Sequence, residues 1–236
     1  MSAGHKVAIV TGGSRGIGAA VVAAFRRDGY AVVSAARSID QPADPGVIAV
    51  SGDIAEPATA ERIVQEARSR FGRVDCLVND AGIYIGKPFT DYTLEDYSAI
   101  TAVNLAGFFH ITQRVIPVMV DQGAGHVVNV TTSLVDQPDH TRPAALAALT
   151  KGGLAAVTRS LAIEYAARQV RFNAVALGVI RTGTQDPGSY DGLAEVHPLG
   201  RLGDLGDVVE GIRYLERAPF VTGEILHIDG GQSAGH

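Results

Sequence analysis

The sequence has a single cysteine, no tryptophan and no long apolar run. Among its 236 residues, Cys76 has no partner for an internal disulfide, so the cysteine usage gives no sign of an oxidising compartment. No apolar stretch approaches the roughly 18 residues that a membrane-spanning helix requires. The apolar run at residues 7–10 is far too short for a signal sequence. We expect a cytoplasmic protein with no membrane partner.

An excess of positive charge is also absent. The chain carries 20 Lys and Arg residues against 25 Asp and Glu residues, for a net charge of −5. Nucleic-acid binding calls for clustered Lys and Arg, so we expect no nucleic-acid partner. The seven histidines show no paired ligand spacing, so no metal site is expected either.

Short apolar runs alternate with longer segments of helical periodicity. Such runs are typical of strands that are covered on both faces. Strands alternating with helices predict one α/β domain over residues 1–236, with a parallel sheet between two helix layers. The expected strands are 6–10, 31–35, 47–51, 74–78, 126–131, 170–176 and 224–228, and the expected helices are 17–29, 56–72, 93–120, 143–168 and 206–217.

Three local signals refine this pattern. Thr93 with Asp96 three residues later is an acidic variant of the capping box, which predicts a helix start. Pro117 predicts a kink or a stop near the end of that helix. The region 178–204 is long, irregular and interrupted by glycine and proline, as binding loops and lids often are. We expect a substrate loop or lid there, and the alternative is a disordered segment.

A glycine-rich turn joins the first strand to the first helix. In a doubly wound sheet this turn lies at the carboxyl edge, where the next helix directs its free N–H groups and positive dipole end outward. A pyrophosphate fits there only if no side chain holds it away from the backbone. The turn has the spacing GxxxGxG, and the residues expected to contact the coenzyme are Gly12, Ser14, Arg15, Gly16, Ile17 and Gly18.

The end of the second strand indicates which coenzyme is used. An NAD site usually offers Asp or Glu there for the ribose 2′-OH, whereas a 2′-phosphate needs a nearby arginine. This sequence has Arg37 at that point and no acid before Asp40. Arg37 and Arg15 together could clamp the 2′-phosphate by charge-assisted hydrogen bonds. The pattern predicts NADP and makes NAD the less favoured coenzyme.

Several motifs in order resemble the short-chain dehydrogenase/reductase family over essentially the whole chain. They are the glycine turn, Asp53, the segment Asn79-Asp80-Ala81-Gly82, Asn104, Ser133 and Lys151. The resemblance implies a Rossmann-type sheet of about seven strands in the order 3-2-1-4-5-6-7. It also implies a homotetramer, which the small-residue face of Gly152, Gly153, Ala155 and Ala156 would allow. The further coenzyme contacts that it implies are Asp53, Ile54, Asn79, Ala81, Gly82, Lys151, Gly178 and Thr182.

The same resemblance implies a catalytic set, and one member is missing. In the family a serine polarises the carbonyl, a tyrosine transfers the proton, a lysine holds the nicotinamide ribose and lowers the tyrosine pKa, and an asparagine orders a water relay. Ser133, Lys151 and Asn104 match three of these. The tyrosine lies four residues before the lysine, on the same helix face, and that position is Ala147.

Four explanations remain open for the missing tyrosine. Another group stands in, His140 first, or else Tyr84, Tyr190 or His197; a histidine with a pKa near 6.5 is a competent acid. A second possibility is a substrate that needs little proton assistance. In a third the site binds NADP(H) without turnover, and in a fourth the alanine is an engineered replacement.

The sequence therefore predicts an NADP-dependent oxidoreductase that transfers a hydride between NADP(H) and a small carbonyl or alcohol substrate. The alternative is a catalytically silent NADP-binding sensor, scaffold or oligomer partner of the same fold.

Overall fold

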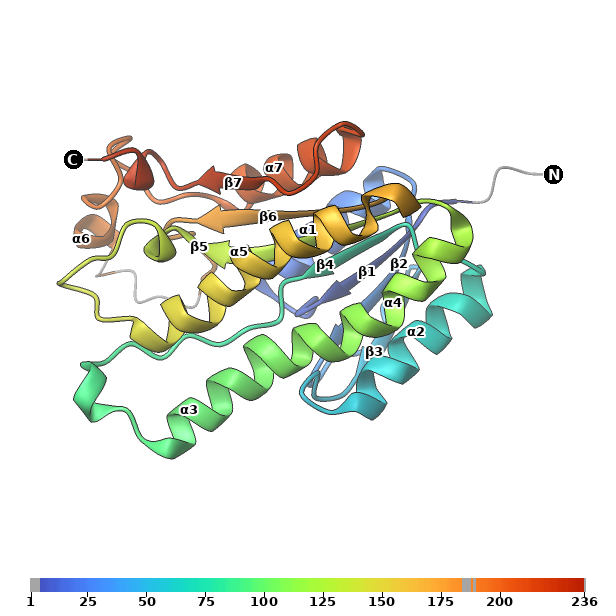
Figure 1. Cartoon of the computed structure of the whole chain (residues 1–236), viewed down its shortest axis with the longest axis horizontal. Coiled ribbons are helices and arrows are strands. Elements are labelled where there is room, and N and C mark those ends of the chain that lie inside the picture. Colours follow the sequence, from blue (N-terminus) through green and yellow to red (C-terminus); the bar gives the residue numbers. More distant parts are fainter. Residues whose placement is uncertain (1–4, 184–187, 189, 236) are drawn as a thin grey trace.

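One parallel sheet of seven strands organises the structure (Figure 1). The computed structural model describes residues 5–183, 188 and 190–235. The strand order is β3-β2-β1-β4-β5-β6-β7, and every neighbouring pair is parallel, which confirms the predicted topology. The strands are β1 Val7–Thr11, β2 Ala31–Ala36, β3 Val47–Ser51, β4 Cys76–Asn79, β5 Gly125–Thr132, β6 Val170–Leu177 and β7 Ile225–Ile228.

Helices cover both faces of this sheet. Buried side chains of α2, α4 and α5 form one core with the sheet, and those of α1 and α7 form another. Figure 1 shows α2, α4 and α5 side by side over one face. The helices are α1 Gly16–Arg27, α2 Pro57–Phe71, α3 Leu94–Thr101, α4 Phe108–Gln122, α5 Ala145–Tyr165, α6 Tyr190–Ala194 and α7 Leu205–Arg217. No helix of the described residues is long and apolar enough to cross a membrane.

The segment predicted as one helix over 93–120 is more complex than expected. The capping box of Thr93 and Asp96 is confirmed at the start of α3. A π-helical segment, Ala102–Gly107, then separates α3 from α4. Pro117 does not stop α4, which continues to Gln122 and ends where Gly123 adopts a left-handed conformation. π-Helical turns inside helices are frequent at functional sites, and this one carries Asn104.

Parallel strands bring their carboxyl ends to one edge of the sheet, and the loops that follow them position the site. These loops are the glycine turn after β1, the segment after β4, the segment between β5 and α5, and the region after β6. The expected lid, 178–204, contains the short helix α6. Residues 184–187 and 189 of that expected lid lie outside the described residues.

Candidate active site

The glycine turn is packed too tightly for side chains. A Cβ atom at Gly18 would collide with the backbone carbonyl of Gly12, and one at Gly12 would lie 2.9 Å from Oδ2 of Asp80. Gly12 also has a φ of +77°, which favours glycine. The turn therefore requires glycine at both positions, in agreement with the prediction from the sequence.

The N-terminus of α1 offers free backbone donors. Arg15 precedes the helix but its side chain caps none of the first N–H groups, and the first turn carries no acidic residue. Helices α3 and α7, by contrast, both begin with a capping box. The Asp80 carboxyl accepts the N–H of Gly18, and the N–H groups of Gly16 and Ile17, together with the helix dipole, favour an anion at this end of α1. The cradle thus fits a pyrophosphate.

A crevice of about 710 Å³ extends from this turn along the carboxyl ends of β1, β2 and β4. Thr182 approaches the turn from the other side, because a Cβ atom at Gly16 would lie 3.6 Å from its Cβ. The volume is within the usual range for a cofactor site. The crevice lining includes eleven of the expected coenzyme contacts: Gly12, Ser14, Arg15, Gly16, Ile17, Arg37, Asp53, Ile54, Ala81, Gly82 and Thr182.

Arg15 and Arg37 are both exposed and have no ion-pair partner among residues 5–183, 188 and 190–235. Asp53 is exposed too, and its Oδ1 accepts the N–H of Ala55 at 2.9 Å. The crevice is therefore lined by two guanidinium groups without an ion-pair partner in the described ranges.

Asn79 supports the crevice from beneath. Its Nδ2 donates to Oδ1 of Asn129 at 2.9 Å and to Oγ1 of Thr112 at 3.1 Å, so its amide is buried between β5 and α4. The loop after it is fixed by Thr11, whose Oγ1 accepts the N–H groups of Asp80 and Ala81. Asn79 thus positions the loop and does not line the crevice.

Lys151 and Asn104 meet behind Gly82. A Cβ atom at Gly82 would lie 3.1 Å from Nζ of Lys151 and 3.3 Å from Oδ1 of Asn104. Lys151 Nζ donates to the carbonyl of Val130 at 2.7 Å. The Asn104 amide is buried, as expected, and is held by the backbone of Ile83 and by Oγ1 of Thr150. These contacts place a cation and a polar amide at the inner end of the crevice.

Asp80 is a titratable residue of this site whose role the sequence did not indicate. Burial raises the pKa of its carboxyl to about 6, although Lys151 and the N–H of Gly18 lower it. Burial lowers the pKa of Lys151 to about 8, although Asp80 raises it. Between those values both groups are charged, and each favours the charged form of the other beside the glycine turn.

Ser133 does not present its hydroxyl to the crevice. The side chain is fully buried, and its single hydroxyl proton faces two acceptors, Oε1 of Gln232 at 2.9 Å and the carbonyl of Leu177 at 3.1 Å. Thr132, the last residue of β5, is partly exposed, and its hydroxyl makes a longer contact of 3.4 Å with the same carbonyl. Thr132 and Ser133 are adjacent in the chain, but at the end of β5 one hydroxyl is partly exposed and the other is buried. The sequence alone could not distinguish them.

Ala147 is buried, with 3% of its surface exposed, in an apolar cluster with Ile100 and Leu146. Ile83, Ile85, Tyr92 and Ala144 pack against this cluster. The methyl group thus lies one helical turn from Lys151, where the resemblance places the tyrosine.

No hydrogen bond or ion pair joins any of the four candidate replacements to Lys151 in the part of the chain that the structure describes. His140 is exposed, and Tyr84 is 57% exposed. The Tyr190 ring lies 5.4 Å from the guanidinium carbon of Arg181. His197 is buried, and its Nε2 accepts the N–H of Val179 at 3.0 Å, so that nitrogen is already engaged.

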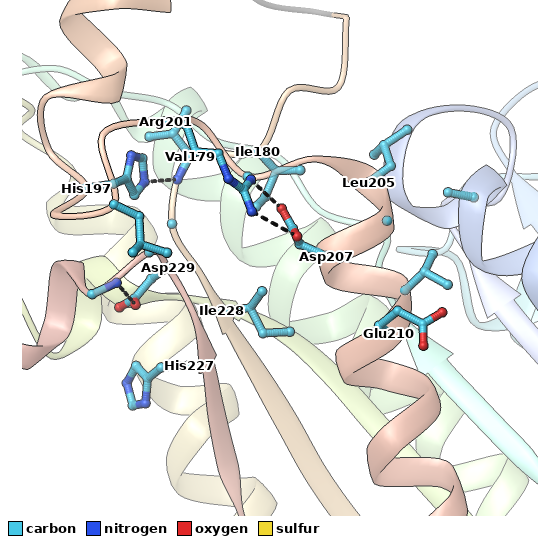
Figure 2. A pocket seen from close by; sticks show the side chains of 18 of the residues that line it. Val179, Ile180, His197, Arg201, Leu205, Asp207, Glu210, His227, Ile228 and Asp229 are labelled. Carbon is cyan, nitrogen blue, oxygen red and sulfur yellow. Dashed lines mark hydrogen bonds and ion pairs between the residues drawn. The ribbon is translucent and has the colours of Figure 1, made fainter.

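A second cavity, of about 760 Å³, lies between α1, α7 and the end of β7 (Figure 2). Gly178 lines this cavity and not the crevice, and its predicted contact with the coenzyme stays a prediction. A Cβ atom there would lie 2.6 Å from Nε2 of His197, so this glycine admits the histidine ring. Arg201 spans the mouth in an ion pair with Asp207 at 2.6 Å.

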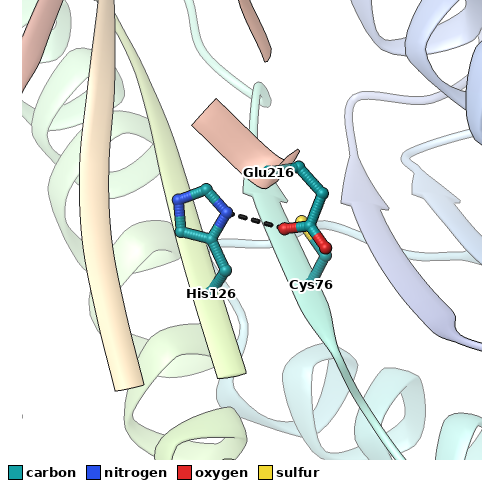
Figure 3. Close-up of side chains that lie close together, drawn as sticks. All are labelled: Cys76, His126 and Glu216. Atoms are coloured by element: carbon teal, nitrogen blue, oxygen red, sulfur yellow. Dashed lines mark hydrogen bonds and ion pairs between the residues drawn. The ribbon is translucent and has the colours of Figure 1, made fainter. Parts of the chain in front are cut away.

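Cys76, His126 and Glu216 converge at the opposite edge of the sheet (Figure 3), and their possible ligand atoms lie within 4.8 Å of one another. The spacing along the chain gave no sign of this group. Nδ1 of His126 donates to Glu216 at 2.7 Å, because Nε2 accepts from Asn173 at 2.9 Å. Tyr30 also donates to Glu216, at 2.7 Å. Hydrogen bonds thus account for the histidine and the carboxylate without a metal.

The charges in this group are fixed by their surroundings. Burial raises the pKa of Glu216, but the hydrogen bonds from His126 and Tyr30 and the nearby Lys6 bring it to about 2. Burial lowers the pKa of His126. The side-chain network therefore ties the residue before β2 to β5, β6 and α7 with a carboxylate and a neutral imidazole.

Comparison with known proteins agrees with this geometry. Residues 12–233 match the family model described as enoyl-(acyl carrier protein) reductase. A 3-oxoacyl-(acyl-carrier-protein) reductase of Thermotoga maritima is 33% identical over 247 residues, covering 96% of this chain and 97% of that protein. A 3alpha-hydroxysteroid dehydrogenase of Mediterraneibacter gnavus is also 33% identical, over 96% of both chains.

Solved structures show the same fold with nicotinamide coenzymes. The structure titled ElxO with NADP bound has a TM-score of 0.92 and 28% identity, covering 98% of this chain and 100% of that one. The 3-ketoacyl-(acyl-carrier-protein) reductase from Brucella melitensis complexed with NADH has a TM-score of 0.88 and 30% identity, covering 98% and 99%. With the glycine turn, the sheet order and the crevice, these matches establish that the chain belongs to the short-chain dehydrogenase/reductase family of oxidoreductases.

Proposed function

We propose that the protein is an NADP-dependent oxidoreductase that transfers a hydride between NADP(H) and a small carbonyl or alcohol substrate. The observation that carries this proposal is the continuity of the crevice. It begins at the N-terminus of α1, which its N-cap residue Arg15 does not cap, and reaches Gly82, behind which lie Lys151 and Asn104. A phosphate cradle and a cation–amide pair at opposite ends of one crevice suit a dinucleotide whose reactive ring lies at the inner end.

Each part of the crevice has its own task in this proposal. The bound coenzyme supplies or accepts the hydride. The α1 N–H groups hold its pyrophosphate, and Lys151 orients the ribose next to the reactive ring. Asn104 fixes Ile83 through two backbone hydrogen bonds and so shapes the wall beside the substrate. The chain lacks the family tyrosine, so a proton must come from another group or from water.

A hydroxyl at the end of β5 polarises the substrate carbonyl. Ser133 takes this role only if its hydroxyl turns away from Gln232. Thr132 needs a smaller change, because it is partly exposed and its contact with Leu177 is longer. The lysine ammonium, with a pKa of about 8, remains protonated at neutral pH and stabilises negative charge that develops nearby.

Turnover tests the proposal directly. Oxidation of NADPH is followed across ketones, aldehydes and quinones, with NADPH binding measured separately. Consumption of NADPH that depends on one of these compounds supports the enzyme. Tight NADPH binding without turnover of any of them supports the alternative of a silent NADP-binding protein, and an absence of binding contradicts both.

The two free arginines predict the coenzyme preference. We expect NADPH to bind at least about tenfold more tightly than NADH, because one or two charge-assisted hydrogen bonds to the 2′-phosphate contribute about 1.5 to 3 kcal/mol each. Arg37→Asp should remove this preference and favour NADH, since an acid at this position accepts the ribose 2′-OH. Both dissociation constants are measured by fluorescence titration at matched ionic strength.

Arg27→Ala is the control for that experiment, because Arg27 is an exposed arginine at the end of α1, outside the crevice. It should leave the ratio of the two dissociation constants unchanged. Tighter binding of NADH than NADPH by the unmodified protein would contradict the assignment.

Asp80 predicts a pH dependence of coenzyme binding. Its carboxyl lies against Gly12 and Gly18, with a pKa of about 6. A pyrophosphate at the turn adds negative charge beside it and raises this pKa further, so the complex retains a proton that the free protein loses. Affinity for NADPH should therefore fall as pH rises above about 6, by at most tenfold per pH unit.

Asp80→Asn removes the titrating group and should flatten this dependence between pH 6 and pH 7.5, below the pKa of Lys151. Isothermal titration in two buffers of different ionisation enthalpy detects the proton uptake itself. An unchanged slope in the variant would assign the dependence to another group.

The proposed assembly is a homotetramer. The small-residue face of α5 is only partly as expected, because Ala155 is buried against the sheet whereas Gly153 and Ala156 are exposed. Leu149 and Ile163 on the same helix are 58% and 79% exposed. Exposed apolar side chains flanking small residues suit contact with a second copy, and light scattering would measure the mass.

A further inference from the structure

The ammonium group of Lys151 has more donors than acceptors. Among residues 5–183, 188 and 190–235, its hydrogen bonding is limited to the carbonyl of Val130, at 2.7 Å from Nζ. No carboxylate in those ranges forms an ion pair with it. An ammonium group has three N–H bonds. Its remaining N–H bonds are therefore available to a molecule that enters the crevice.

The glycine at position 82 leaves this ammonium open to the crevice. Gly82 lines the crevice, and a Cβ atom there would lie 3.1 Å from Nζ of Lys151. Any side chain at residue 82 would therefore press against the ammonium and cover it. Nζ thus lies directly behind a crevice residue that has no side chain, at the inner end where the proposed function places the reactive ring.

A carboxyl group lies on the same stretch of loop. Asp80 also lines the crevice, and its carbonyl oxygen would be 3.7 Å from the same Cβ atom at Gly82. Its carboxyl accepts the N–H of Gly18 and is held beside the glycine turn. The negative charge of Asp80 favours the charged form of Lys151. Asp80 is therefore the charge partner of the ammonium.

The described lining of the crevice limits the possible proton donors. It includes no tyrosine, histidine or cysteine, and its ionisable side chains are those of Arg15, Arg37, Asp53 and Asp80. Arginine does not give up its proton in proteins. Asp53 is an exposed residue after β3, and the Asp80 carboxyl faces the glycine turn, so neither lies at the inner end. Lys151 is left as the group there that can give a proton.

We propose that Lys151 takes the role of the missing tyrosine: its ammonium gives a proton to the carbonyl oxygen of the substrate, with Asp80 as its charge partner. This inference rests on the proposed function and names its proton donor. The carbonyl carbon gains a hydride from NADPH, the oxygen gains the proton, and one N–H bond of the ammonium breaks to leave a neutral amine. Water then returns a proton to Nζ. When an alcohol is oxidised, the amine accepts the proton of the hydroxyl.

The acidity of Lys151 suits this role. Burial brings its pKa to about 8, and Asp80 keeps it from falling lower. A donor whose pKa lies near the working pH transfers a proton most effectively. A phenol at residue 147 would still be the better donor, because a rigid ring fixes its hydroxyl whereas Nζ ends a flexible side chain.

Lys151→Arg tests the proton transfer, because it keeps a positive charge and removes the group that can lose a proton. At saturating NADPH, kcat for carbonyl reduction should fall by about 100-fold or more, with NADPH binding largely retained. In the unmodified protein kcat should decline above about pH 8. The residual activity of Lys151→Arg should lack this decline.

Asp80→Asn tests the charge partner. Without the carboxylate, the pKa of Lys151 falls, so the decline of kcat should begin at a lower pH than in the unmodified protein. Acidification should then restore kcat in the variant, which it would not do if the substitution had only disturbed the fold. An unchanged pH profile would remove Asp80 from the proposal.

Lys87→Arg is the matched control, because Lys87 follows β4 and its Nζ donates to Asp96 at 2.6 Å, away from the crevice lining. It should change neither kcat nor the pH profile. His140→Gln tests the competing donor and should also have no effect. Melting curves establish that each variant is folded. Full activity in Lys151→Arg, or a loss of kcat in His140→Gln alone, would overturn the inference and keep the oxidoreductase.

A titration of the lysines needs no substrate. The chain has only three, Lys6, Lys87 and Lys151, so NMR of protein labelled with ¹³C at lysine Cε resolves them, and Lys151→Arg identifies the third. Its resonance should titrate near pH 8, and at lower pH in Asp80→Asn. Titration above pH 10 would overturn the inference even if carbonyl compounds are reduced. An unmodified protein that reduces no carbonyl compound would contradict the proposed function and this inference together.

Discussion

A Gly18→Val variant is expected to bind NADPH about 100-fold more weakly than the unmodified protein. The new side chain would begin with a Cβ atom that collides with the carbonyl of Gly12 and lies 2.9 Å from Oδ2 of Asp80. The glycine turn must move, and the N–H groups at the start of α1 then no longer point at the pyrophosphate. Two lost charge-assisted hydrogen bonds of about 1.5 kcal/mol each correspond to about 100-fold in affinity.

Gly206→Ala is the control for this prediction, since a Cβ atom at Gly206 meets nothing within 4 Å. It should leave NADPH affinity and melting temperature nearly unchanged. The dissociation constants are measured by quenching or calorimetry, and circular dichroism establishes that Gly18→Val is folded. A folded Gly18→Val variant with unaltered affinity would move the coenzyme away from the glycine turn and undo the functional proposal.

Ala147→Tyr is expected to raise kcat for reduction of simple carbonyl compounds by about 10²-fold to 10⁴-fold, the usual contribution of a positioned proton donor. Residue 147 lies one turn before Lys151 on α5, and the ammonium would lower the pKa of a phenol placed beside it. The gain should be largest for substrates that the unmodified protein reduces slowly. Initial rates of NADPH oxidation measure it.

The same change should lower the melting temperature. Ala147 is 3% exposed, and Ile100, Leu146, Ile83 and Ile85 surround it, so a phenol ring must displace side chains at a typical cost of about 1 to 3 kcal/mol. Ala145→Tyr, on the exposed start of α5, is the control and should change neither rate nor stability much. A folded Ala147→Tyr variant that binds NADPH yet gains no activity would mean that another part of the catalytic set is also altered.

The sheet and the coenzyme cradle could be predicted from the sequence because their signals are local. Apolar runs such as residues 126–131 set the strands, and the spacing of Gly12, Gly16 and Gly18 sets the turn within a few residues. Boundaries shifted by one or two residues, as at β4, which begins at Cys76 and not at residue 74. A strand ends where its last hydrogen bonds to the neighbouring strands end, and the residues of one strand do not specify those neighbours.

The substrate side of the site could not be predicted in the same way. The direction of the Ser133 hydroxyl depends on Gln232, 99 residues later in the chain. Asp80 and Lys151 perturb each other's pKa because folding buries both beside the same turn.

Because the imidazole of His126 is neutral, the far edge of the sheet takes up and releases no protons in acid–base experiments. Asn173 commits its Oδ1 to the N–H of Glu224 and so leaves His126 Nε2 an acceptor that cannot also hold a proton. Acidifying a solution from pH 8 to pH 6 therefore leaves the Tyr30–Glu216–His126 chain in a single ionic form. Protons that the folded protein takes up or releases between pH 8 and pH 6 on binding a nucleotide therefore belong to groups at the opposite, carboxyl edge of the sheet.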